Sequence, residues 1–240
     1  MYEYAMKSER GQRTYNEDRI RMYDNGSEQL FVLADGLGGM GNGELAADTA
    51  VRSVCGRFLW DQDEDFLPRA METAQNAVNY KKKQLPEAAG MSSTLSLLYL
   101  TEKYAQWAHV GDSRVYMFRR GRVLFQTKDH SVPQMLVDMG EIPTKEIRHH
   151  PDRNRLLRTL GWEWPDQGYT LSQAVKLMSG DTFLLCSDGF WEEILEKEML
   201  RELKRAETAI QWLKKMQKIV ETNGKNKDMD NYSAICVWIR

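Results

Sequence analysis

The chain has 240 residues, of which 42% are hydrophobic and 28% are charged, proportions that are ordinary for a soluble globular protein. Its net charge of −2 gives no reason to expect nucleic acid or an anionic membrane as a partner. It holds no signal-peptide core and no apolar run of about 18 residues. We therefore expect a cytoplasmic protein with no membrane segment, and we expect it to act as a monomer.

The three cysteines, Cys55, Cys186 and Cys236, are far apart, and each lies in an apolar segment. Their odd number and wide spacing do not match a zinc site. We interpret them as reduced side chains of the core.

Residues 1–28 contain a polar segment, 8–18, between two short strand-like pieces. The apolar run at 31–34 predicts a buried strand. From Glu44 onward apolar residues recur at helical spacing, and a second helix is expected at 66–83.

Strands dominate the middle of the chain. The patterns predict strands at 94–100, 104–110, 114–118 and 123–126, with a hairpin turn between the last two. Ser131 is a suitable N-cap for a short helix that runs through Met139. The segment 141–168 contains three of the six prolines and only a weak pattern, so we expect a long surface excursion that forms a flap over a site.

The last part of the chain is predicted to contain a strand at 182–186, helices at 191–200 and 206–221, and a closing strand at 232–239. The closing strand is apolar on both faces and should be central in its sheet. Hairpins with few long helices indicate antiparallel sheet with helices packed outside, in one domain that covers residues 1–240.

Acidic side chains recur at the ends of the predicted strands, namely Glu17, Asp18, Asp35, Asp112, Asp188 and Asp230. A single Asp-Gly pair after a strand is usually a turn, so the inference rests on the whole set. If these strand ends converge, the carboxylates repel one another unless cations neutralise them. Oxygen ligands of this kind suit Mg²⁺ or Mn²⁺.

The glycines after Asp35 allow another interpretation. Gly36, Gly38 and Gly41 fit the dinucleotide pattern G-x-G-x-x-G between a strand and a helix. Asp35 argues against it, because an anion repels a pyrophosphate, and the rest of the dinucleotide-fold pattern is missing. Nucleotide binding stays open as the alternative.

Seven short motifs stand in order along nearly the whole chain: Arg13-Thr14-Tyr15-Asn16-Glu17-Asp18, Asp35-Gly36-Leu37-Gly38-Gly39, Gly111-Asp112-Ser113-Arg114, Asp129-His130-Ser131, His150-Pro151 with Arg153-Asn154, Ser187-Asp188-Gly189, and Asp230-Asn231. Together they resemble the motifs of the metal-dependent protein serine/threonine phosphatases of the PP2C (PPM) type, particularly the bacterial ones. The resemblance implies an α+β fold in which two stacked antiparallel sheets are flanked by helices on both faces, an α-β-β-α sandwich.

The resemblance also implies a chemistry, the hydrolysis of phosphoserine and phosphothreonine in proteins by a water that two Mn²⁺ or Mg²⁺ ions activate. By this resemblance Asp35, Asp188 and Asp230 hold the two ions together with the backbone carbonyl of Gly36. Asp112 joins Asp188 at a third, weaker ion. The partners implied are phosphoproteins and a cognate Ser/Thr kinase. The intact set of ligands argues against an inactive relative that only binds phosphoproteins.

The remaining roles follow from the same resemblance. Arg13 receives the substrate phosphate, because a guanidinium can bind two of its oxygens at once. Asp18 holds metal-bound water, Glu17 supports it, and Asn231 orients Asp230 or a water. Leu37 departs from the family pattern, which has methionine or a histidine proposed as general acid at this position.

Overall fold

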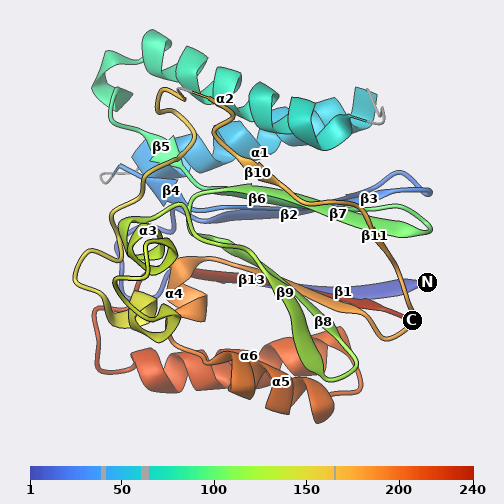
Figure 1. Cartoon of the computed structure of the whole chain (residues 1–240). Helices are drawn as coiled ribbons and strands as arrows, with labels where there is room; N and C mark the ends of the chain where they lie inside the picture. The colour runs from blue at the N-terminus through green and yellow to red at the C-terminus, as the bar shows by residue number, and fades with distance from the viewer. Residues whose placement is uncertain (39–41, 61–64, 165) are drawn as a thin grey trace.

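The structure is a computed structural model that describes residues 1–38, 42–60, 65–164 and 166–240. In these residues two antiparallel sheets are stacked face to face, and a layer of helices covers the outer face of each sheet (Figure 1). The α-β-β-α sandwich expected from the family resemblance is therefore confirmed. No helix in the described ranges is long and apolar enough to cross a membrane.

The first sheet brings together the two ends of the chain. Its strands lie in the order β1 (Tyr2–Glu9), β13 (Tyr232–Ile239), β12 (Thr182–Cys186), β8 (Arg114–Arg119) and β9 (Arg122–Gln126). As its two apolar faces predict, β13 is an interior strand, paired with β1 on one side and β12 on the other. The β8–β9 hairpin turns at Arg120 and Gly121, which both have positive φ.

The second sheet comes mostly from the first half of the chain. Its strands lie in the order β10 (Thr170–Leu171), β7 (Tyr104–Val110), β6 (Leu95–Leu100), β3 (Gln29–Ala34) and β2 (Arg19–Asp24), and β11 (Val175–Lys176) also pairs with β7. Two very short strands, β4 (Gly36–Leu37) and β5 (Ser92–Ser93), pair beside it.

Two long helices, α1 (Asn42–Trp60) and α2 (Phe66–Gln84), cover the second sheet, and α5 (Glu196–Lys204) and α6 (Ala209–Gly224) cover the first (Figure 1). Shorter turns are η1 (Pro86–Ala88), α3 (Val132–Asp138), η2 (Thr144–His149) and α4 (Asp188–Trp191). Ser131 caps α3 as expected, accepting a hydrogen bond from the Gln134 backbone N–H. The predicted helix at 191–200 is wrong, because Leu195 is extended and a new helix begins at Glu196.

The strands bury side chains on both faces. Phe31 and Leu33 of β3 point into the core between the sheets, while Leu30, Val32 and Ala34 pack under α1 and α2. Alternate residues of a strand face opposite sides, so a strand buried on both faces reads as a continuous apolar run. A third core joins the first sheet to α5 and α6.

The pairing register brings the ends of several strands to one end of the sandwich. Cys186, the last residue of β12, lies opposite Ala234 of β13 and Arg114 of β8. In the second sheet Ala34 lies opposite Arg19. The loops that carry the predicted site residues therefore meet at this end, whereas the two termini lie side by side at the other end (Figure 1).

Candidate active site

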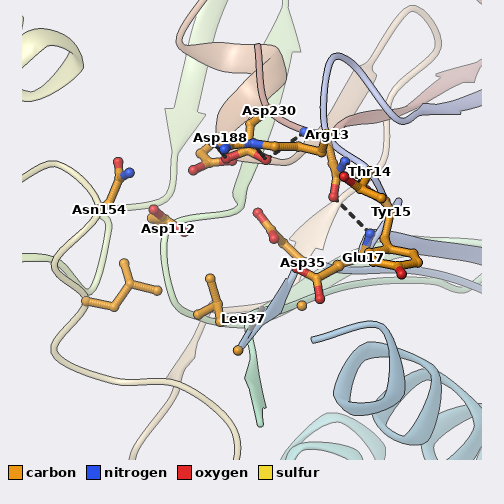
Figure 2. Close-up of a pocket in the computed structure, with 14 residues that line it drawn as sticks. Arg13, Thr14, Tyr15, Glu17, Asp35, Leu37, Asp112, Asn154, Asp188 and Asp230 are labelled. Carbon is orange, nitrogen blue, oxygen red and sulfur yellow. Dashed lines mark hydrogen bonds and ion pairs between the residues drawn. The ribbon is translucent and has the colours of Figure 1, made fainter. Parts of the chain in front are cut away.

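An open pocket of about 440 Å³ lies where these loops meet. Its lining consists of Arg13, Thr14, Tyr15, Glu17, Asp35, Gly36, Leu37, Gly38, Asp112, Asn154, Leu156, Asp188, Asp230 and Asn231. Every residue assigned to the site from the sequence is in this set except Asp18. Figure 2 shows the carboxylates of Asp35, Asp112 and Asp188 reaching toward a common space.

Two of the motif glycines permit close backbone contacts beneath the pocket. A Cβ atom on Gly36 would lie 2.1 Å from the Gly43 carbonyl oxygen, and one on Gly189 would lie 2.2 Å from the Asn231 carbonyl oxygen. Both contacts are far too short for a side chain, so glycine is required by the packing. The first joins the Asp35 loop to α1, and the second joins the Asp188 loop to the start of β13.

The negative charges of the carboxylates in the pocket repel one another. Burial raises the pKa of Asp35 well above its ordinary value, and the charges of Asp18 and Asp188 raise it further. Burial and the charge of Asp188 likewise raise the pKa of Asp112. Burial and Asp230 raise the pKa of Asp188 to about 7. Such a group of acids is stable in its charged form only with cations beside it.

Asp18 lies behind the pocket and is only 2% exposed. One carboxylate oxygen, Oδ2, accepts a hydrogen bond of 2.8 Å from the Ser187 hydroxyl. The other, Oδ1, is buried and has no hydrogen-bond partner among the residues that the structure describes. Burial raises the pKa of Asp18 to about 7. An unpaired buried carboxylate oxygen is costly unless a cation or a water receives it.

Arg13 bonds to acidic side chains within the pocket. Its Nε and Nη2 each donate a hydrogen bond of 3.0 Å to a carboxylate oxygen of Asp230, and Nη1 donates one of 3.2 Å to Asp228. Asp228 was not among the residues predicted from the sequence. Only its closeness to Asp230 could have pointed to it.

The sequence resemblance assigns Asn231 to orient Asp230 or a water, and its backbone N–H donates a hydrogen bond of 2.8 Å to Asp230 Oδ1. The side chain of Asn231 has other partners. Its side-chain oxygen accepts from the Glu17 backbone N–H, and its side-chain NH₂ donates to the carbonyls of Arg10 and Tyr15, each bond being 2.8 Å long. Three bonds from one buried side chain thus hold the loop that carries Arg13. Glu17 in turn accepts a bond from the Gly43 backbone N–H.

Two residues with no assigned chemistry hold the Asp35 and Asp112 loops. The Thr94 hydroxyl accepts a hydrogen bond from the Asp35 backbone N–H and lies 2.7 Å from the Ser113 hydroxyl, so its role is structural. His130 accepts a bond at Nδ1 from the Gly111 backbone N–H. Burial lowers the pKa of His130 to about 3, so this ring is neutral and does not serve as an acid at neutral pH.

The donor set fits a hard divalent cation. The pocket offers carboxylate oxygens in excess of its positive charge, and the unpaired oxygen of Asp18 lies behind it. Within the described ranges, no three Asp, Glu, His or Cys side chains are close enough together to enclose an ion. The carboxylate of Asp230 is instead bonded to Arg13 through both oxygens.

The fold does not favour the nucleotide alternative. A dinucleotide site needs parallel strands joined by a helix, whereas β3 pairs antiparallel with both β2 and β6. Gly36 and Gly38 line the acidic pocket. Gly41, the third glycine of the pattern, lies outside the described residues.

Comparison with known proteins identifies the family. The model of the family named protein phosphatase 2C matches residues 7–232. The chain belongs to the protein phosphatase 2C family. The resemblance inferred from the sequence motifs is thereby confirmed.

Several relatives within this family are similar over most of the chain. The serine/threonine protein phosphatase PstP of Mycobacterium tuberculosis is 32% identical over 213 residues, a match that covers 86% of this chain and 40% of PstP. The chain thus spans about two fifths of the length of that relative. The serine/threonine phosphatase stp of Listeria innocua is 30% identical, with 84% of this chain and 83% of stp covered.

A solved structure of the same family adds a metal. The crystal structure of the catalytic domain of PstP in complex with two manganese ions superposes with a TM-score of 0.84 at 28% identity, covering 100% of this chain and 99% of that one.

Proposed function

We propose that this protein phosphatase 2C chain hydrolyses phosphoserine and phosphothreonine in proteins, with Mn²⁺ or Mg²⁺ as cofactor. The observation that supports this best is the meeting of Arg13 with the carboxylates of Asp35, Asp112, Asp188 and Asp230 in one pocket. This combination supplies a cation for a phosphate and oxygen donors for metal ions. The named relatives are serine/threonine phosphatases, and one is crystallised with two manganese ions.

Asp35, Asp188 and Asp230, with the Gly36 carbonyl, are the groups that we propose to hold two ions, and Asp112 would join Asp188 at a third. When bound, such ions neutralise the carboxylates, activate a water and stabilise charge on the phosphoryl oxygens. Asp18 and Glu17 would orient water next to these five metal-binding groups. The unpaired Asp18 oxygen supports this role.

Arg13 would bind the phosphate of the substrate. Its guanidinium already bonds to two oxygens of one anion, Asp230, and a phosphate presents the same geometry. None of the described lining residues is a serine, cysteine or histidine. Because the lining carboxylates of Asp35, Asp188 and Asp230 are assigned to the metal ions, we propose direct attack by water, with no phosphorylated enzyme.

We further propose that residues 1–240 act as one phosphatase domain, in which 141–168 is a flap over the substrate. Asn154 and Leu156 of this segment line the pocket, which supports a contact with the substrate. We expect a cytoplasmic monomer that opposes a Ser/Thr kinase. The three buried, free cysteines suit a reducing compartment.

A panel of peptides tests this proposal. The purified chain is mixed with phosphoserine, phosphothreonine and phosphotyrosine peptides, each with Mn²⁺, with Mg²⁺ and with a chelator. We expect phosphate release from the first two peptides with either metal and none with the chelator. Release that persists with the chelator would contradict the metal assignment. Binding of the peptides without release under any condition would instead indicate an inactive relative.

A further inference from the structure

Trp191 links two loops of the site. It ends α4, the short helix that begins at Asp188, and its side chain is 2% exposed. The indole N–H donates a hydrogen bond of 3.0 Å to the backbone carbonyl of Asp112. One bond therefore connects the helix that carries Asp188 to the loop that carries Asp112.

Two arginines hold the indole ring. The guanidinium carbon of Arg114 lies 3.4 Å from the ring centroid and that of Arg148 lies 5.3 Å away. Both oxygens of Asp129 accept hydrogen bonds from Arg114, at 2.8 and 2.7 Å, and both of these residues are buried. A buried ion pair with its hydrogen bonds satisfied is difficult to displace, so the indole ring of Trp191 is held in a fixed position.

The Asp112 loop is held from its other side as well. The His130 backbone N–H donates to the Gly111 carbonyl at 2.9 Å, and the Gly111 N–H donates to the His130 ring at 3.2 Å. The strand pairing that places Arg114 opposite Cys186 already brings this turn near the Asp188 segment, and the bond from Trp191 adds a direct contact between the turn and α4. It also gives a role to Arg114 and Asp129, which belong to two of the sequence motifs but do not line the pocket.

We propose that Trp191 is a positioning residue which, seated by Arg114 and Asp129, fixes the backbone of Asp112 relative to Asp188. It thereby sets how well this pair of carboxylates holds a divalent cation. The part that concerns the cation rests on the proposed function. Without the indole N–H, the buried carbonyl of Asp112 loses its partner and the turn relaxes.

The chain offers a matched control. Trp212 of α6 is also fully buried, and its indole N–H also donates to a backbone carbonyl, that of Met199, at 3.0 Å. It packs in the core between the first sheet and α5 and does not line the pocket. Trp191→Phe and Trp212→Phe therefore remove the same kind of bond in two places.

Amide hydrogen exchange of the metal-free chain is the first measurement. We expect the amides of segment 110–114 to exchange about tenfold faster in Trp191→Phe, because a buried hydrogen bond is lost. In Trp212→Phe the exchange rate of this segment should not change. If Trp191→Phe does not fold, benzothienylalanine at position 191 keeps the ring shape and removes only the N–H. Unchanged exchange at 110–114 in a folded variant overturns the proposal.

Calorimetric titration with Mn²⁺ is the second measurement. We expect Trp191→Phe to weaken the weakest Mn²⁺ site about tenfold and to leave the tighter sites within twofold, with no change in Trp212→Phe. Equal Mn²⁺ affinities in Trp191→Phe and the unmodified chain overturn the link to the cation. An unmodified chain that binds no Mn²⁺ contradicts the proposed function instead, and the exchange measurement then decides the role of Trp191 alone.

Discussion

Arg13 and Asp230, which are 217 positions apart in the chain, are joined by two hydrogen bonds of 3.0 Å. The residue that we expect to bind the phosphate is therefore bonded to a carboxylate that we expect to hold a metal ion. We expect the guanidinium to move from Asp230 to the phosphate when the substrate binds. The guanidinium would exchange one anion for another and keep its two-oxygen geometry.

Removing the guanidinium should weaken substrate binding. We expect Arg13→Ala to lower kcat/KM for a phosphothreonine peptide roughly 10- to 100-fold, mainly through KM, because charge-assisted hydrogen bonds to the phosphate are lost. Arg10 is an exposed arginine in the same loop, and Arg10→Ala should change kcat/KM less than about twofold. Steady-state kinetics measure both, and an unchanged KM in Arg13→Ala would refute the phosphate role.

The side-chain amide of Asn231 should control the loop that carries Arg13. Asn231→Asp replaces the NH₂ that donates to the Arg10 and Tyr15 carbonyls with an oxygen that repels them. We expect trypsin to cleave after Arg10 or Arg13 about tenfold faster in this variant. Asn223→Asp removes a comparable but exposed bond to the Glu193 carbonyl and should not change cleavage there. Equal cleavage in the two variants would show that Asn231 does not hold the loop.

Gly36 should not tolerate a side chain. An alanine Cβ would lie 2.1 Å from the Gly43 carbonyl oxygen and 2.9 Å from that of Glu17, so backbone must move. We expect Gly36→Ala to lower the free energy of unfolding by roughly 1–3 kcal/mol, the usual cost of overpacking. Gly56→Ala, in α1 where a Cβ meets nothing within 4 Å, should raise it by up to about 1 kcal/mol. Urea unfolding measures both, and a neutral Gly36→Ala would contradict the close contact.

The three cysteines should be unreactive in the folded chain. All are buried, and burial raises the pKa of Cys55 to about 11 and also raises the pKa values of Cys186 and Cys236. The folded chain therefore keeps its thiols protonated at pH 8. The contribution of these thiols to the free energy of unfolding is full below the thiol pKa of the unfolded chain, and it is lost as the pH rises from there toward 11. We expect no labelling by a thiol reagent at pH 8 and full labelling in urea. Rapid labelling of the folded chain would contradict the burial.

Much of the fold could be predicted because local pattern determines it. The strands at 104–110 and 232–239 have the bounds that their apolar runs predict. The helix prediction at 191–200 is wrong because the spacing of apolar residues does not show where one helix ends and the next begins. There Leu195 leaves the helix, and its backbone N–H bonds to the Glu198 side chain.

The partners of the site residues are harder to predict than their identities. Family motifs point to Arg13, Asp112 and Asp230, but no local pattern says that Arg13 bonds to Asp230, or that Trp191 bonds to Asp112. These pairs form only when strands distant in sequence are brought into register. The very short strands β10 and β11 are missed for a similar reason, since they exist only through pairing with β7.

The central claim is that the carboxylates of the pocket would hold the metal ions on which hydrolysis of a phosphoprotein depends. Mn²⁺-dependent phosphate release from a phosphothreonine peptide tests it directly in the unmodified chain, in Asp35→Asn and in Asp138→Asn, an exposed carboxylate at the end of α3. We predict Mn²⁺-dependent release by the unmodified chain and by Asp138→Asn, and a loss of at least about a thousandfold in Asp35→Asn. Release by Asp35→Asn at the unmodified rate and the same Mn²⁺ concentration would contradict the account.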